Sequence, residues 1–456
     1  MRERRYAWLA LLVVAAAAVV RLAAAANEFW LDEVWSLRIA IDLGSAWEAF
    51  TVRHDNNHIL NTLYLHWMGL RDAWIVYRLP SVVAGTATVA LVLAAERPGR
   101  RTAALFTAAL VALSYPLVLY SAEARGYAPA LFCALASFYA LERHEQTPQR
   151  AFLATFWATA VAGMLCHAVY LQAYLALLGW SLLRTRHLPT LVARHGVPLA
   201  AAAAFYLFFL RGMVIGGGPV YRTLDVVRDA AAWALGIPTA GTIAVAVVAG
   251  VTLAGFAVLF RERSPRWQFF VLVLAVVPTL VLVVTQPPVL YFRYFLVQIL
   301  FFYLLAGSAL AALAHSGTVG RVAALGALAV YAAIQMVPLR ALATEGRGGC
   351  VETVRYLGAQ TRGDTVVVGS DEDFRNPLML WYFQRFLPAG RQLRHVPQTA
   401  WPPAGPEWVL VHDLGPATNR PAAMQDGGGH RYDRVAGFQC GGIARWYWWV
   451  YRRSGV

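Results

Sequence analysis

The chain has 456 residues, of which 59% are hydrophobic and only 14% are charged. Soluble domains carry about 25% charged residues, so this composition excludes a soluble protein and indicates that most of the chain lies in a membrane. The formal net charge is +14, and every basic residue is an arginine, because the sequence contains no lysine. Such an excess suits either nucleic-acid binding or cytoplasmic loops, and the positions of the arginines favour the loops.

The first apolar run follows a basic N-terminus and covers residues 6–26, interrupted by Arg21. At about 1.5 Å per residue this run is roughly 31 Å long, which matches the hydrocarbon core of a bilayer. Arg21 lies near its outer end, where a long side chain can extend to the interface. We expect an uncleaved transmembrane helix, with a signal peptide cleaved near 23–26 as the alternative.

Further apolar runs follow, and together they predict a polytopic α-helical membrane protein with about 11 transmembrane helices. They cover residues 74–95, 102–120, 127–141, 151–166, 168–183, 197–211, 239–260, 267–285, 290–313 and 321–340. The links on the N-terminal side are short, and each carries arginine: Arg2, Arg4 and Arg5; Arg97, Arg100 and Arg101; Arg143 and Arg150; Arg184, Arg186 and Arg194; Arg261, Arg263 and Arg266; and Arg321. The positive-inside rule makes these links cytoplasmic.

The opposite links hold most of the acidic, aromatic and histidine residues. They are residues 27–73, 121–126, a turn near His167, 212–238, 286–289 and everything after 340. We therefore divide the chain at residue 340. Residues 1–340 are the predicted transmembrane domain, with a first extracytoplasmic loop at 27–73, and residues 341–456 are a predicted extracytoplasmic domain of an inner-membrane protein.

The C-terminal domain has the pattern of a small α/β fold. Helices are expected at 351–361 and 377–386, and strands at 365–369, 408–412 and 443–451, separated by linkers rich in proline and glycine. Cys350 and Cys440 are its only cysteines, and we expect a disulfide between them because thiols oxidise outside the cytoplasm. Cys133 and Cys166 lie in apolar runs and are expected to stay reduced.

Two adjacent carboxylates, Asp32 and Glu33, follow the first apolar run between Trp30 and Trp35. A charge so near the membrane costs free energy, which makes this pair a candidate for catalysis. The alternative is structural, with the tryptophans at the interface and the acidic pair capping the next short helix. The rest of the loop favours catalysis, because a dense polar cluster follows at residues 53–58.

In that cluster, His54 and His58 are candidate substrate ligands. With Asp55 they could also bind a divalent metal, but no further ligand at a fixed spacing supports a metal site. Two arginine motifs lie at the outer ends of later runs. The first contains Glu123, Arg125 and Tyr127, and the second contains Arg293 and Tyr294.

The planar guanidinium groups of Arg125 and Arg293 suit phosphate. On this interpretation Glu123 faces the same cavity as Asp32. The structural alternatives are an ion pair between Glu123 and Arg125, and an Arg293 that extends to lipid head groups.

The order, spacing and membrane side of these motifs resemble the GT-C superfamily of membrane glycosyltransferases over roughly residues 6–310. The branch most similar to this chain is glycosyltransferase family 39 and its relatives, the protein O-mannosyltransferases and the lipid A aminoarabinose transferases. The resemblance is carried by Asp32-Glu33, the segment from His54 to Tyr64, Arg78-Leu-Pro-Ser81, Ser121-Ala-Glu-Ala-Arg-Gly-Tyr127 and Arg293-Tyr294. The relatives often have His-Pro-Pro at 57–59, where this chain has Asn-His-Ile, which weakens any transfer of acceptor specificity.

The resemblance implies a hexosyl- or pentosyltransferase that moves a sugar from a polyprenyl-phosphate or diphosphate carrier to a lipid, glycan or protein acceptor at the outer face of the cytoplasmic membrane. Asp32 is the implied general base, and attack at an anomeric carbon needs such a base. The other implied site residues are Glu33 and Glu123 as orienting carboxylates, and His54, His58, Arg125, Tyr127, Arg293 and Tyr294 as substrate ligands.

Two other functions stay open. An O-antigen ligase or polymerase also uses polyprenyl-linked donors, although ligases usually place their chemistry in a large late outer loop. A lipid-linked sugar transporter or flippase would be expected to show matching halves with broken helices, and the sequence has no such symmetry. No cofactor follows from the sequence beyond the divalent metal considered above, and no nucleic-acid partner is expected.

Overall fold

The computed structural model describes residues 3–238, 241–287, 289–413, 420–438 and 446–455. By their internal contacts the residues form two units. The first comprises Met1–Ala25 and Ile39–Leu339, and the second comprises Ala26–Arg38 and Arg340–Val456. The segment 26–38 therefore packs with the C-terminal part of the chain, although the sequence places it in the first extracytoplasmic loop.

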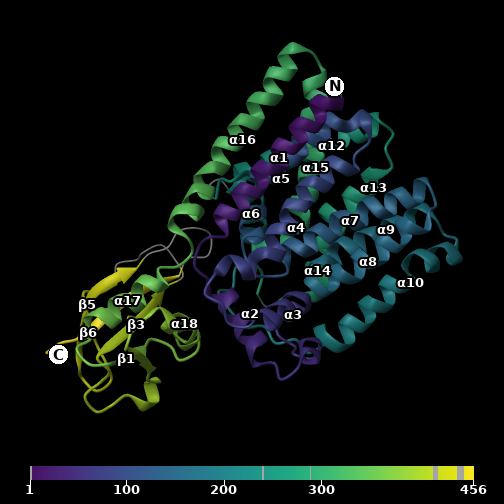
Figure 1. The fold of residues 1–456 in the computed structure, drawn as a ribbon. Helices are drawn as coiled ribbons and strands as arrows, with labels where there is room; N and C mark the ends of the chain where they lie inside the picture. The colour runs from purple at the N-terminus through teal and green to yellow at the C-terminus, as the bar shows by residue number, and fades with distance from the viewer. Residues whose placement is uncertain (1–2, 239–240, 288, 414–419, 439–445, 456) are drawn as a thin grey trace. The chain divides into compact units, whose positions relative to one another are not determined.

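The first unit is built from helices, and each apolar run predicted from the sequence lies mainly in helical segments where the structure describes it. In chain order its helices are α1 (Glu3–Ala24), the end of α2 (Leu31–Asp42), α3 (Ile59–Met68), α4 (Trp74–Ala95), α5 (Arg101–Leu113), α6 (Tyr115–Ser121), α7 (Tyr127–Gln146), α8 (Arg150–Cys166), α9 (Tyr170–Arg184), α10 (Leu188–Phe205), η3 (Tyr206–Leu210), α11 (Thr223–Leu235), α12 (Gly241–Arg261), α13 (Arg266–Val271), η4 (Leu272–Val276), α14 (Val277–Thr285), η5 (Phe292–Phe295), α15 (Leu296–His315) and α16 (Thr318–Glu345). Figure 1 shows α1, α5, α15 and α12 side by side.

Within the part of the chain that the structure describes, seven helices are long and apolar enough to cross a membrane. The segments Pro98–Leu113 and Tyr115–Ser121 meet at 63° and make an eighth if they count as one span. The bend has a local cause, because the Ser114 side chain accepts the Leu117 N–H at a new helix start that also contains a proline. The other predicted spans are the helices α7, α8 and α9, and the polytopic helical fold is confirmed.

Arg21 does not extend to the interface as expected, because its side chain is buried. The guanidinium donates to the backbone oxygens of Val111 and Ala112, at 3.2 and 3.3 Å, and Nε donates to the Ser121 hydroxyl at 3.3 Å. Carbonyl groups at a helix end lack intrahelical partners. The break between α5 and α6 supplies such carbonyls, and Arg21 satisfies them.

A buried ion network joins the helix ends on the predicted cytoplasmic side. Arg266 donates to both carboxylate oxygens of Glu142 at 2.5 and 2.7 Å and to Glu96 at 2.7 Å. Glu96 also accepts the Tyr139 hydroxyl at 3.1 Å. The network connects α4, α7 and α13 through charged groups that are each less than a tenth exposed.

In its described residues, the C-terminal part of the second unit combines one six-stranded sheet with two α-helices that follow α16. Its elements are α17 (Cys350–Gln360), β1 (Thr365–Ser370), α18 (Arg375–Phe383), β2 (Gln392–His395), β3 (Trp408–Asp413), β4 (Ala423–Gln425), β5 (Arg431–Phe438) and β6 (Tyr447–Arg453). The strand order is β2-β1-β3-β6-β5-β4, with β1 parallel to β2 and β3 and the other pairs antiparallel. The predicted small α/β fold is confirmed, and the strands β2, β4 and β5 were not expected.

The central strand β3 is covered on both faces. Trp408 donates through Nε1 to the Thr361 hydroxyl at the end of α17, at 2.8 Å. The alternate residues Val409 and Val411 pack with Tyr432 and Tyr451 in a separate cluster. A strand buried on both faces has a continuous apolar sequence, which explains the run at 408–411. Cys133 and Cys166 are buried thiols, whereas Cys440 lies outside the described residues, so the disulfide stays a prediction.

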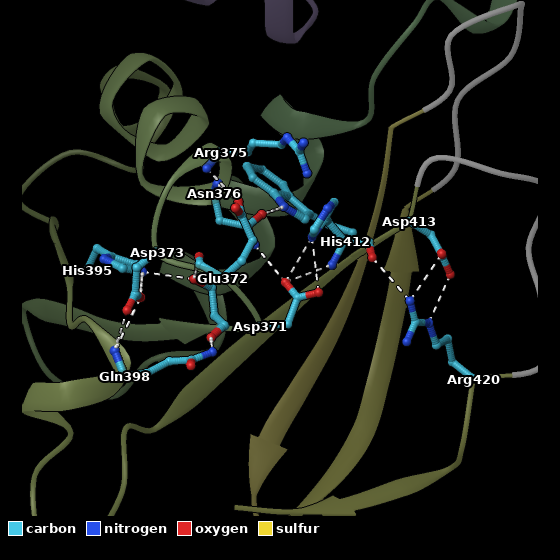
Figure 2. Close-up of polar contacts among 12 residues, drawn as sticks. Asp371, Glu372, Asp373, Arg375, Asn376, His395, Gln398, His412, Asp413 and Arg420 are labelled. Carbon is cyan, nitrogen blue, oxygen red and sulfur yellow. Dashed lines mark hydrogen bonds and ion pairs between the residues drawn. The ribbon is translucent and has the colours of Figure 1, made fainter. Parts of the chain in front are cut away.

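A polar cluster lies at the ends of β1, β2 and β3 (Figure 2). Asp371 accepts the Asn376 amide at 2.8 Å and lies 3.0 Å from Nδ1 of His412. Glu372 Oε1 accepts the backbone N–H groups of Arg375 and Asn376 at the start of α18, at 2.5 and 2.8 Å. Because these carboxylates bind groups of the unit itself, we interpret the cluster as the connection between the strand ends and α18.

Candidate active site

The first unit contains a cavity of about 560 Å³ that brings together segments far apart in the sequence. Of the residues predicted to bind substrate, its lining includes His58, Arg125, Tyr127, Arg293 and Tyr294. The rest of the lining is largely apolar and comes from α8, α9, η3 and α14, with Met164, Leu175, Phe209 and Leu282 among its residues. The cavity therefore combines a cationic polar part with a long apolar wall.

Arg125 lies in the loop between α6 and α7 and is held in place by three neighbouring side chains. Its Nη2 donates to the Asn56 side chain at 2.9 Å, and its Nη1 lies 3.9 Å from the Glu123 carboxylate. The guanidinium also lies over the Tyr127 ring, 5.0 Å from the centroid. The loop is close to its neighbours, because a Cβ on Gly126 would lie 1.8 Å from the Cys166 carbonyl oxygen. Glycine is thus required at the position that joins Arg125 to Tyr127.

His58 and His167 lie beside each other in the cavity, with ring centroids 4.4 Å apart. Nδ1 of His58 accepts the Gly126 N–H at 2.9 Å, and Nδ1 of His167 accepts the Val169 N–H at 3.0 Å. A neutral imidazole that accepts at Nδ1 carries its proton on Nε2. Nε2 of His58 is buried and has no hydrogen-bond partner among the described residues, so it can donate to a ligand.

The charges of the cavity keep both imidazoles neutral. Burial, His167 and the guanidinium groups of Arg125 and Arg293 hold the pKa of His58 well below its usual range. Burial and the same two arginines lower the pKa of His167 in the same way. Both arginines thus act electrostatically on the same pair of rings, which indicates a common positive field across the polar part of the cavity.

Arg293 lies in η5 between two tyrosines. Its guanidinium is 4.3 Å from the Tyr291 ring centroid and 5.9 Å from that of Tyr294. The Gln172 amide donates to the Tyr294 carbonyl at 2.8 Å and accepts from the Gln298 amide at 2.9 Å. These contacts attach η5 to α9 and α15 and fix the start of the helix that carries Arg293.

Asp55 also lines the cavity. Burial raises the pKa of its carboxyl, but hydrogen bonds with His54 and the Gly216 N–H, together with the charge of Arg125, outweigh that effect and hold the pKa below its usual range. His54 is 3.1 Å from the same carboxylate and is not part of the lining. No group of three or more histidine, cysteine or acidic side chains in the described chain is arranged to hold a metal.

Asp32 and Glu33 belong to the second unit and lie in the first turn of α2. Glu33 is fully buried, and its Oε2 accepts the Trp30 N–H at 3.3 Å. This contact is the capping interaction that the sequence offered as the structural alternative. Asp32 is 9% exposed. That Asp32 and Glu123 face one cavity stays a prediction.

Gln172 lies outside the motifs that predict site residues, and the sequence predicts His167 only as part of a turn. Both follow from the packing of α8 and α9, and His167 is one residue beyond the end of α8. His167 lies between two short apolar runs at their predicted outer end, and this position indicates a site residue in the same way as the position of His58 does. Nothing in the sequence connects residues 58 and 167 directly.

Comparison with protein-family models gives no match, and comparison with curated protein sequences gives none either. Solved structures do match. The crystal structure of ArnT from Cupriavidus metallidurans in the apo state aligns with a TM-score of 0.60 and 14% identity, over 90% of this chain and 93% of that chain. The structure of the same protein bound to undecaprenyl phosphate aligns with a TM-score of 0.55 and 14% identity, over 96% and 97%. Both alignments extend over at least nine tenths of each chain and show that this chain shares the fold of ArnT, so the predicted polytopic helical fold with a C-terminal domain is confirmed.

Proposed function

We propose that this chain, which has the fold of ArnT, transfers a sugar from a polyprenyl-phosphate carrier to an acceptor at the outer face of the cytoplasmic membrane. The observation that carries the proposal is the cavity of the first unit, where Arg125, Arg293 and the donor Nε2–H of His58 adjoin an apolar wall. A phosphate attached to a long hydrocarbon chain needs both surfaces. The undecaprenyl phosphate bound to ArnT belongs to this ligand class.

In the proposed reaction the carrier phosphate is the leaving group. As its bond to the anomeric carbon breaks, negative charge develops on the phosphate oxygens, and Arg125 and Arg293 stabilise that charge. The neutral imidazole of His58 donates one further hydrogen bond without adding charge. Asp32 takes the proton of the attacking hydroxyl or amine of the acceptor, while Glu33 fixes the start of the helix that carries Asp32. Glu123 orients Arg125 through their ion pair.

The activity is tested with purified protein, a radiolabelled polyprenyl-phosphate sugar and a cell extract divided into lipid, glycan and protein fractions. We expect label in one fraction, which also identifies the acceptor. Loss of a general base typically costs about 10²- to 10⁴-fold in rate, so Asp32→Asn should lower transfer by that factor. Asp42→Asn, in the last turn of the same helix, is the matched control and should transfer normally.

Near wild-type transfer by Asp32→Asn would show that Asp32 is not the base. A protein that moves the labelled carrier across a vesicle membrane without transferring the sugar would instead be a transporter.

A further inference from the structure

The segment that carries Asp32 and Glu33 is attached to the second unit on the N-terminal side of the pair. The Glu28 carboxylate accepts the backbone N–H groups of Cys350 and Val351 at the start of α17, at 2.9 and 3.1 Å. The Phe29 ring stacks on Tyr382 of α18, with centroids 5.3 Å apart and planes 20° apart. A carboxylate at a helix N-terminus is favoured by the unsatisfied N–H groups and by the helix dipole.

The same segment is attached on the C-terminal side of the pair. The Trp35 ring meets the Phe374 ring edge to face, with centroids 4.9 Å apart. The Arg38 guanidinium lies 4.8 Å from the centroid of Trp381. The two carboxylates are therefore bracketed by contacts with α17 and α18 at positions 28, 29, 35 and 38.

A contact also lies directly before the pair. The Arg347 guanidinium is 3.8 Å from the Trp30 ring centroid, and the Trp30 N–H is bound by Glu33. Phe29, Val34 and Leu37 are fully buried. A segment with this many fixed side chains has little freedom to change the position of its backbone.

We propose that the second unit is a positioning element, whose helices α17 and α18 hold residues 28–38 so that the carboxylate of Asp32 keeps its place. The proposal rests on the proposed role of Asp32 as general base. A base displaced by about 1 Å can cost 10²-fold in rate, which gives the C-terminal part of this unit, residues 340–456, a function in the reaction. The residues of the C-terminal part that contact 28–38 are positioning residues, because they act through Asp32. Phe374 and Trp381 are the two whose substitution tests this role.

The test uses the full-length protein with Phe374→Ala and, separately, Trp381→Ala. Phe374 is 53% exposed, so its truncation leaves no buried cavity. Both variants should lower kcat by about 10- to 100-fold and leave the KM for the labelled carrier unchanged. Hydrogen exchange of the amides at 28–38 should become faster, while exchange in α7 and α8 stays the same.

Trp401→Ala is the matched control. Trp401 is also a half-buried tryptophan of the second unit, but it packs with the separate cluster that contains Tyr432. This variant should keep both kcat and the exchange of residues 28–38. An equal loss of kcat in Trp401→Ala would show a general effect of domain stability and overturn the proposal.

Two further outcomes would also overturn it: faster exchange at 28–38 with unchanged kcat, or unchanged exchange in both α18 variants. These outcomes are distinct from failure of the proposed function, in which wild-type protein transfers no sugar at all. The exchange measurement does not depend on activity and still reports whether α18 holds the segment.

Discussion

The imidazole of His58 differs from the two arginines in what it can offer a phosphate. Its Nδ1 is occupied by the Gly126 N–H, and its pKa is held well below the usual range by burial and by the neighbouring His167 and arginines. It therefore stays a neutral donor at physiological pH. Such a group adds a directed hydrogen bond to a site whose charge is already supplied by Arg125 and Arg293.

Substitution of His58 separates its two nitrogen atoms. In His58→Asn the amide oxygen can still accept the Gly126 N–H, but no donor remains at the position of Nε2. A neutral hydrogen bond contributes about 0.5–1.5 kcal/mol, so affinity for a polyprenyl phosphate should fall roughly 3- to 10-fold. Binding measured on purified protein tests this, with Gly126-loop integrity checked by an unchanged melting temperature. Wild-type affinity in the variant would remove His58 from the site.

At this scale the sequence predicted the residues that lie in recognisable motifs. His58, Arg125, Tyr127, Arg293 and Tyr294 share one cavity, and all of them lie in or beside links that the sequence assigns to one side of the membrane. His167 could not be paired with His58, since their contact depends on how α3 and α8 pack. The sequence predicts Asp55 only as a metal ligand, whereas the structure includes it in the cavity lining.

At the scale of elements, the attachment of residues 26–38 to α17 should depend on pH. Burial raises the pKa of the Glu28 carboxyl from its ordinary 4.5 to about 7. The hydrogen bonds from Val351 and Cys350 and the charge of Arg355 act in the opposite direction, whereas the charge of Glu352 raises the pKa further. Between pH 4.5 and 7 the folded unit thus holds a proton that the unfolded chain has lost. The contribution of Glu28 to the free energy of unfolding is therefore greatest below about pH 4.5, and it is lost as the pH rises through about 7.

Glu28→Gln should remove that dependence, because the amide oxygen still accepts the N–H groups of α17 but does not titrate. The measurement is hydrogen exchange of residues 28–38 from pH 5 to pH 8, corrected for the intrinsic exchange rate. Wild-type protection should decrease across this range, and the variant should stay constant. Equal pH dependence in both proteins would contradict the assignment.

The ion network of α4, α7 and α13 makes a second prediction for elements. Arg266→Ala leaves Glu96 and Glu142 buried without their common cation, and breaking a buried pair in this way costs about 3–5 kcal/mol. The exposed pair of Arg228 and Asp225, 3.4 Å apart, is the control, since Arg228→Ala should cost less than about 1 kcal/mol. Unfolding in detergent by denaturant titration compares the two. Similar losses in both variants would show that the network contributes little.

Elements with a strong apolar pattern were predictable, and those fixed by tertiary contacts were not. The run at 74–95 forms α4 with those bounds, and the apolar run at 408–411 forms β3. The strand β2 lies beside β1 at one end of the described strand order, and its sequence Gln-Leu-Arg-His has the polar pattern of a loop. The bend between α5 and α6 divided a run that appears continuous, because Ser114 and Pro116 begin a new helix inside it.

For the whole molecule, the arginine-bearing links predict the topology. A reporter fused after Arg340 or at the C-terminus should report a non-cytoplasmic location, and one fused near Arg263 should report a cytoplasmic location. The expectation follows from an odd number of spans between the ends of the chain. A cytoplasmic C-terminus would mean that the predicted number of spans is wrong by an odd number, and it would also contradict the predicted extracytoplasmic location of the Asp32 segment.

The fold as a whole was predictable because helix-length apolar runs and charge asymmetry specify a helical membrane bundle. The division into units was not, because residues 26–38 leave the first unit through contacts such as those of Phe29 and Trp35 with α18. Those contacts join residues more than 300 positions apart, as the bond from Cys350 to Glu28 shows. No local pattern at 26–38 indicates them.

Binding of undecaprenyl phosphate to the purified protein is the measurement that shows whether the cavity of the first unit binds the phosphate of a polyprenyl carrier. Each lost charge-assisted hydrogen bond costs about 1.5–3 kcal/mol, so Arg125→Ala and Arg293→Ala should each weaken binding about tenfold or more. Lysine at either position should restore it only in part, because it lacks the bidentate fork. Arg71→Ala, an exposed arginine on the same predicted side, should bind normally. Wild-type affinity in both Arg125→Ala and Arg293→Ala would contradict the account and leave these arginines as lipid anchors.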